Sequence, residues 1–163
     1  WEYKDDVTAT YFDNDQAPIV IGGVEQVETL ALKGVKVGDA AQFTAFLGAD
    51  YNVANNFNVD FGYRFAGNLY AQFDATSVGP DGALKLPSFG LADAGATYSI
   101  PFDDKKLSFR VNVNNLFDTT YIAESDTNIF AQPGDDTYDG INTSNRVFFG
   151  FGTTWNLSAR FNF

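Results

Sequence analysis

Phe57-Asn58-Val59-Asp60-Phe61-Gly62-Tyr63-Arg64-Phe65-Ala66-Gly67-Asn68-Leu69-Tyr70-Ala71-Gln72 is the stretch that decides the fold, because apolar and polar side chains alternate along it. The odd positions are mainly large and apolar, while the even positions are mainly polar or small. Side chains of a β-strand point alternately to two faces, whereas an α-helix would repeat its apolar positions every three to four residues. The stretch therefore predicts a long strand with one apolar and one polar face.

Four other segments repeat this two-residue period and predict further strands. Their apolar faces span residues 43–53, 92–100, 107–117 and 147–163, with Phe148 and Thr153 as exceptions in the last segment. A sixth strand is predicted over residues 6–12. Strands of about 14–17 residues would exceed the usual length in globular sheets and would suit tilted strands that cross a bilayer.

The predicted connections alternate between short and long. Residues 54–56 and 101–106 form short turns, whereas 13–40, 73–90 and 118–145 form long segments rich in Gly, Asp, Asn and Pro. Outer-membrane β-barrels have short periplasmic turns and longer extracellular loops. We therefore expect the three long segments to be extracellular and the C-terminus to lie on the periplasmic side.

Composition excludes several classes of function. The 163 residues include 10 basic and 21 acidic residues, for a net charge of −11, so nucleic acid is not an expected partner. His and Cys are absent, which leaves no catalytic triad or thiolate metal site, and we predict that the chain is not an enzyme. Calcium could be bound by Asp13 and Asp15, or by Asp135, Asp136 and Asp139; otherwise these are solvated acidic loops. No other cofactor is expected.

The placement of charge favours a sheet in lipid over a soluble β-sandwich or a lipocalin-like barrel, which remain the alternatives. Each charged residue within the predicted strands falls on the face opposite the large apolar side chains. These residues are Asp50, Asp60, Arg64, Asp93, Arg110 and Arg160. The fold class we predict is all-β, an antiparallel transmembrane β-barrel.

The last residues carry an apolar pattern of their own. Trp155, Leu157, Phe161 and Phe163 alternate along the final strand and resemble the signal by which the barrel-assembly machinery recognises outer-membrane proteins. The alternative is an ordinary core strand.

Several motifs resemble the late barrel of TonB-dependent receptors from Bacteroidetes, the starch-utilisation type included. They are the stretches 69–74, 85–98 and 149–163 and the element Asn114-Asn115-Leu116-Phe117-Asp118, which is followed by Tyr121. This resemblance implies a 22-stranded outer-membrane barrel filled by a plug domain. Residues 1–163 would then be about its last six strands, without the plug, and unable to close into a barrel alone.

The resemblance also implies a function and partners. These are import of a siderophore, cobalamin, glycan or peptide driven by the TonB complex, and for a glycan receptor a surface lipoprotein lid. A passive porin or a structural outer-membrane protein is the alternative. A plug would contact the lumen charges Asp50, Asp60, Arg64, Arg110 and Arg160. If Val53 pairs with Phe57, then Asp50 lies opposite Asp60, and Arg64 is the local residue to neutralise them. Phe73, Tyr121, Phe130 and Tyr138 are the loop aromatics expected to contact substrate.

Overall fold

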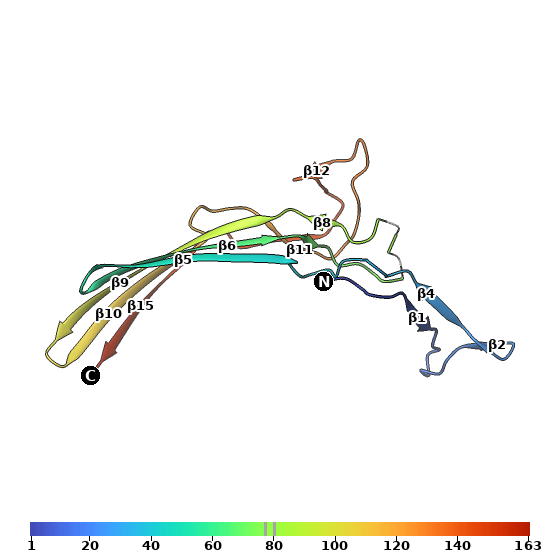
Figure 1. The fold of residues 1–163 in the computed structure, drawn as a ribbon, viewed down its shortest axis with the longest axis horizontal. Helices are drawn as coiled ribbons and strands as arrows, with labels where there is room; N and C mark the ends of the chain where they lie inside the picture. The colour runs from blue at the N-terminus through green and yellow to red at the C-terminus, as the bar shows by residue number, and fades with distance from the viewer. Residues whose placement is uncertain (77, 80) are drawn as a thin grey trace. The chain divides into compact units, whose positions relative to one another are not determined.

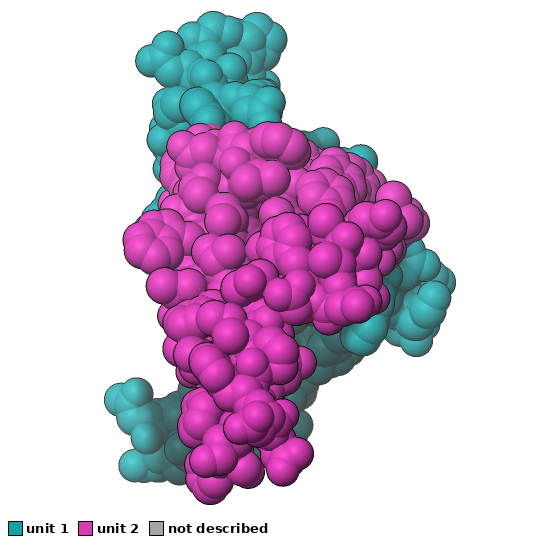
Figure 2. Space-filling view, turned by 90° about the vertical axis from the view of Figure 1, so that its left-hand side faces the viewer, with its two compact units in different colours: residues 1–40, 70–86, 124–146 teal, residues 41–69, 87–123, 147–163 magenta. Residues whose placement is uncertain are grey.

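The computed structural model describes residues 1–76, 78–79 and 81–163, so positions 77 and 80 of the predicted 73–90 loop lie outside the described residues. The described chain is built from β-strands and loops. None of its described segments forms a helix long and apolar enough to cross a membrane. The chain divides into two compact units, shown in different colours in Figure 2: unit 1 is residues 1–40, 70–86 and 124–146, and unit 2 is 41–69, 87–123 and 147–163.

Unit 2 is dominated by one five-stranded antiparallel sheet. Its strands, which lie side by side as a curved sheet in Figure 1, are β5 (Phe43–Ala54), β6 (Phe57–Gly67), β9 (Phe89–Phe102), β10 (Lys105–Asn114) and β15 (Thr154–Asn162). Their spatial order is the same as their order along the chain, with β5 and β15 at the edges. The sheet is therefore open, as expected of a segment that cannot close into a barrel alone.

The register of this sheet keeps the predicted alternation continuous across all five strands. In one row on the apolar face, Val59 pairs with Ala96, and Ala96 pairs in turn with Val111. The next row on the opposite face is polar, because Asn112 lies between Gly95 and Asn156. A shift of one residue in any strand would mix the two faces. The sheet thus has one apolar face and one polar face.

The large side chains of the apolar face are exposed to solvent in the part of the chain that the structure describes. These side chains are exposed at 37–74 %: Leu47, Tyr51, Phe61, Tyr63, Tyr98, Phe109, Val111, Trp155, Leu157 and Phe161. A contiguous apolar surface of this kind is unusual on a soluble monomer and marks an interaction with a membrane or a partner. A soluble sandwich would bury this face against a second sheet.

The short turns and the C-terminus lie at one end of the sheet. Asp103 and Asp104 connect β9 to β10, and the pairing of Lys106 with Asn162 places the last residues beside this turn (Figure 1). Residues 55–56, which connect β5 to β6, lie toward the same end, because Phe57 pairs with Tyr98. The alternation of short and long connections is as predicted.

Three details of the sequence prediction are wrong. The predicted strand over residues 6–12 shortens to β1 (Val7–Thr10), which pairs with β4 (Val27–Leu30) in a separate two-stranded sheet. The long strands span 9–14 residues and not 14–17. The final segment is divided into β14 (Val147–Phe149) and β15. Local hydropathy indicates a strand, but only the hydrogen-bonding partners fix its ends.

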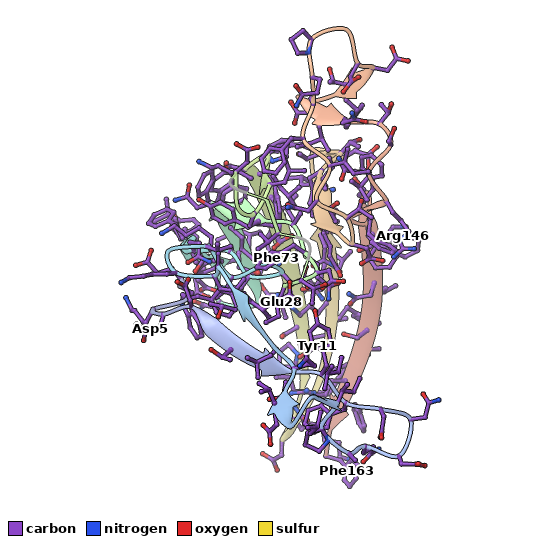
Figure 3. The ribbon with its side chains drawn as sticks, turned by 90° about the vertical axis from the view of Figure 1, so that its right-hand side faces the viewer. Asp5, Tyr11, Glu28, Phe73, Arg146 and Phe163 are labelled. Atoms are coloured by element: carbon purple, nitrogen blue, oxygen red, sulfur yellow. The ribbon has the colours of Figure 1, made fainter. Side chains whose placement is uncertain are left out.

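Unit 1 consists of short hairpins and loops. Besides β1 and β4 it contains β2 (Val20–Ile21) paired with β3 (Val24–Glu25), β8 (Lys85–Leu86), and β12 (Thr137–Tyr138) paired with β13 (Ile141–Asn142). Two strands, β7 (Leu69–Tyr70) and β11 (Ile122–Ser125), have residues in both units. Tyr11 donates a hydrogen bond to Glu28, which joins the two sides of the N-terminal hairpin (Figure 3).

The two-faced sheet generates a prediction for a charge placed on either face. Val111→Arg, on the apolar face of β10, should destabilise the full-length protein in phospholipid vesicles by about 2–4 kcal/mol, because it moves a guanidinium into hydrocarbon. Asn112→Arg, on the polar face one residue away, is the matched control and should change stability by less than about 1 kcal/mol. Urea unfolding followed by tryptophan fluorescence measures both. Equal effects of the two substitutions would contradict the assignment of faces.

Candidate functional site

An ion pair spans three strands at the centre of the polar face. The Arg110 guanidinium on β10 donates two hydrogen bonds to the Asp60 carboxylate on β6, with Nη1–Oδ2 and Nη2–Oδ1 distances of 2.9 and 3.0 Å. Arg110 also donates to the Thr97 hydroxyl at 3.0 Å. Such two-point guanidinium–carboxylate contacts fix geometry as well as charge. Both side chains are about one third exposed, so water weakens the attraction.

The Arg110 side chain reaches Asp60 by crossing β9 at Gly95, which has no side chain; we call this crossing point the Gly95 passage. Gly95 lies between Asp60 on one neighbouring strand and Asn112 on the other. A Cβ atom at this position would be 2.6 Å from both Arg110 Nη2 and Asp60 Oδ2, which is closer than real Cβ contacts come. Any larger residue at this position would therefore push the charged ends of Arg110 and Asp60 out of their present positions.

The other charges on the polar face have partners that differ from the sequence prediction. Asp50 does lie opposite Asp60, although the hairpin pairs Ala54 with Phe57 and leaves a bulge at Val53. Arg64 does not neutralise these carboxylates, so that prediction is wrong. The pleat and twist of the sheet place Arg64 beside the Asp93 carboxylate, at 2.9 Å.

Asp50 is stabilised by an amide instead of a cation. Asn58 Nδ2 donates to Asp50 Oδ1 at 2.7 Å. Arg160, on β15, lines a cavity of about 350 Å³ together with Lys106 and several hydroxyl groups near the turn end of the sheet. The five charges named from the sequence thus share the polar face, but most are satisfied by neighbours within the sheet.

Asn115, in the Asn-Asn-Leu-Phe-Asp element, fixes the loop after β10. Its buried side chain donates to the carbonyl oxygens of Thr119 and Phe151 at 2.9 and 3.1 Å, and it accepts from the Thr119 N–H at 2.8 Å. Its own N–H donates to Asp93 Oδ1 at 3.0 Å. Its φ of 51° lies in the left-handed region, which Asn tolerates better than most residues.

Asp118 explains why the final strand is interrupted. Its carboxylate accepts a hydrogen bond from the Thr153 N–H at 2.8 Å, and the Thr153 hydroxyl donates to the Asn115 carbonyl at 2.7 Å. The backbone at Thr153 thus bonds to this loop instead of continuing a β ladder. Thr153 is the residue that broke the sequence alternation.

The structure brings together two of the four loop aromatics predicted to contact substrate. Phe73 and Phe130 line one cavity of about 430 Å³ in unit 1. Tyr121 belongs to unit 2, where its ring lies 4.2 Å from that of Phe89. Tyr138 lies on β12, exposed, away from this cavity's lining. A site formed by all four residues is not observed.

The acidic loop residues considered for calcium take part in turns. Asp13 Oδ1 accepts from the N–H groups of Asp15 and Ala17, both at 2.9 Å. Asp135 Oδ2 accepts from Asn142 Nδ2 at 2.7 Å. Among the described residues, no group of three or more carboxylates has the geometry to hold a metal ion. Calcium binding stays a prediction.

The residues of the expected assembly signal lie on β15 or directly after it. Trp155, Leu157 and Phe161 share its apolar face and are exposed, and Phe163 is 96 % exposed. Their recognition by the barrel-assembly machinery stays a prediction.

The sequence reasoning did not predict the roles of three residues that shape the polar face and its border. Gly95 was not singled out, because neither alternation nor charge distinguishes it, and Asn115 was named only as part of the Asn-Asn-Leu-Phe-Asp element. Phe46 was also missed: it is a large apolar residue on the polar face, 69 % exposed, with its ring over Gly48 and Gly62. Its position out of phase with the apolar row was the available signal.

Comparison with known proteins places the chain among receptors. The family model for TonB-dependent receptor-like β-barrels matches residues 1–116. The catecholate siderophore receptor Fiu of Escherichia coli K12 is 31 % identical over 116 residues, which cover 64 % of this chain and 14 % of that receptor. Fiu of E. coli UTI89 is 33 % identical over 81 residues, 47 % of this chain and 9 % of the receptor. The chain thus spans a small part of these curated relatives, and no solved structure matches it. Because these relatives come from E. coli, they do not support the expected Bacteroidetes type.

Gly95 generates a prediction with an unusual sign. Replacing an interior strand glycine by alanine ordinarily stabilises a protein by about 0.5–1 kcal/mol. Gly95→Ala should instead destabilise the folded protein in lipid vesicles by about 0.5–1 kcal/mol, because the new methyl group displaces the exposed ends of Arg110 and Asp60 from each other. Gly79→Ala, where no atom lies within 4 Å of the new Cβ, is the control. A stabilising Gly95→Ala substitution would contradict the proposed passage.

A second prediction concerns the two hydrogen bonds that the Asn115 side-chain amide donates. Asn115→Asp keeps the oxygen that accepts from Thr119 but removes the donors to two carbonyl groups, so it should destabilise the protein by about 1–3 kcal/mol. Asn114→Asp is the control, since Asn114 makes one side-chain contact, to Thr154 Oγ1 at 3.3 Å. Thermal unfolding measures both variants, and equal melting temperatures would refute the role of Asn115.

Proposed function

The chain belongs to the TonB-dependent receptor-like β-barrel family, and from this membership we propose that it forms part of the wall of an outer-membrane receptor that imports a nutrient with energy from the TonB complex. The observation that carries the proposal is the family match over residues 1–116, more than half of the chain. The open sheet with an apolar and a polar face supports it, because such a sheet suits a barrel wall between lipid and lumen. The family is one of receptors in the bacterial outer membrane.

We propose a siderophore as the substrate, ahead of cobalamin, a glycan or a peptide. The support is the similarity to two proteins named as catecholate siderophore receptors. A glycan substrate, with a lipoprotein lid, would follow from the starch-utilisation type of receptor, which rests on the sequence resemblance alone.

The orientation that we propose places the short turns and the C-terminus in the periplasm and the loops of unit 1 outside the cell. Short turns on the periplasmic side are the rule for outer-membrane barrels. The polar face of β5, β6, β9, β10 and β15 would then face the lumen and the plug of the complete receptor. Since Asp60 and Asp93 already have arginine partners, Arg160 and Lys106 remain for contact with plug carboxylates.

Energy dependence tests this function directly. The full-length receptor, expressed in a strain without other siderophore receptors, should accumulate radiolabelled ferric siderophore. Uptake should fall to background when a protonophore collapses the proton-motive force, or when TonB is absent. Uptake that persists under both conditions would show a passive pore and reject the proposal.

A further inference from the structure

Negative charge is concentrated in unit 1. This unit contains 15 of the 21 acidic residues but only five of the 10 basic ones, which gives it a formal charge of −10, while unit 2 has a charge of −1. Most of the negative charge of the chain therefore belongs to unit 1. A net negative charge of this size raises the concentration of cations near the protein surface and lowers that of anions.

A cavity in unit 1 combines carboxylates with aromatic rings. We call it the acidic cavity; it has a volume of about 430 Å³, within the usual range for small-molecule sites. Its lining comes from three stretches of unit 1, and its apolar part is formed by Phe73, Ile129 and Phe130. Its carboxylates are those of Asp74, Asp81 and Asp126. The position of Phe73 is labelled in Figure 3.

Hydrogen bonds hold the stretches that line the acidic cavity against each other. Asn128 Nδ2 donates to the Gly82 carbonyl at 2.8 Å, and Asn128 Oδ1 accepts from the Leu84 N–H. The Gln72 N–H donates to the Ser125 carbonyl at 2.8 Å. The cavity is therefore formed before a ligand arrives, which reduces the entropic cost of binding.

The three carboxylates are not equally available. Asp126 accepts a hydrogen bond from Arg146 Nε at 2.9 Å, and Asp74 accepts from the Thr76 N–H and hydroxyl at 2.9 and 2.7 Å. Asp81 makes no hydrogen bond or ion pair with the described residues. Desolvation, and to a smaller extent the charge of the Asp126 carboxylate, raise the pKa of Asp39.

The chemistry of the lining favours an organic cation over a metal ion. No group of described carboxylates is close enough to ligate a metal. Two phenyl rings beside carboxylates can cover the apolar part of a ligand and attract its positive group through their π faces. Catecholate oxygens are negatively charged when they bind iron, so this lining would repel an anionic catecholate complex.

We propose that the acidic cavity receives a positively charged organic group, such as an ammonium, of the transported substrate, with Asp81 as its principal carboxylate. This inference rests on the proposed uptake function and names the charge class of the substrate. It separates this receptor from the catecholate receptors that it resembles.

A pair of matched probes tests the proposal on the full-length receptor in detergent. The probes are 2-phenylethylammonium and its neutral N-acetyl derivative, with binding measured by titration calorimetry at low ionic strength. The ammonium form should bind at least fivefold more tightly, and the difference should shrink at high salt, because salt screens exposed charges.

Two substitutions locate the effect. Asp81→Asn should abolish most of the preference for the ammonium probe. Asp139→Asn removes the same charge from unit 1 at a residue outside the cavity lining and should leave the preference intact. Equal binding of the two probes, binding of neither, or equal loss in both variants would overturn the proposal. Energy-dependent uptake by the same receptor would still support the proposed function, so the two failures are distinguishable.

Discussion

The hydrogen-bond register of the five long strands is the constraint on which the rest of the structure depends. The large apolar side chains gather on one face of the sheet, and most polar ones on the other, only because the pairings of β5, β6, β9, β10 and β15 agree in phase. A slip of one residue would place charges among the apolar side chains. The ion pair between Asp60 and Arg110 penalises such a slip, since it crosses β9 at Gly95, where no side chain stands in its way.

The loops depend on this sheet for their position. Asn115 and Asp118 fix the exit from β10 through hydrogen bonds to three separate stretches of chain, at Asp93, at Thr119 and at residues 151–153, so the irregular segment begins from a defined point. Loops carried on a rigid scaffold are where binding residues usually lie. Charge is also divided between the two units. Unit 2, which contains the sheet, is nearly neutral, whereas unit 1 carries most of the negative charge.

The sequence predicted the faces of the sheet well and its side-chain pairings poorly. Alternation is a local property, so the apolar rows of Phe57–Gly67 and its neighbours followed from the residues alone. Side-chain pairing depends on the neighbouring strands. Arg64 was expected to neutralise Asp60, but Arg110 reaches Asp60 across Gly95, and Arg64 pairs with Asp93. The break at Thr153 was visible as a lapse in alternation, yet its cause, Asp118, lies 35 residues away. Phe73 and Phe130 share a cavity, which no periodicity in their loops indicates.

A scan of single cysteines along β10 tests the central claim most directly, which is that one face of this sheet contacts lipid and the other water. This chain contains no cysteine, so single cysteines for spin labelling can be placed at residues 107–113 in the full-length receptor in lipid vesicles, with any cysteine elsewhere in the receptor replaced by serine. Accessibility to oxygen, which dissolves in lipid, should peak at odd positions, and accessibility to a water-soluble nickel complex should peak at even positions. A profile without this two-residue period, or with the two phases reversed, would contradict the account.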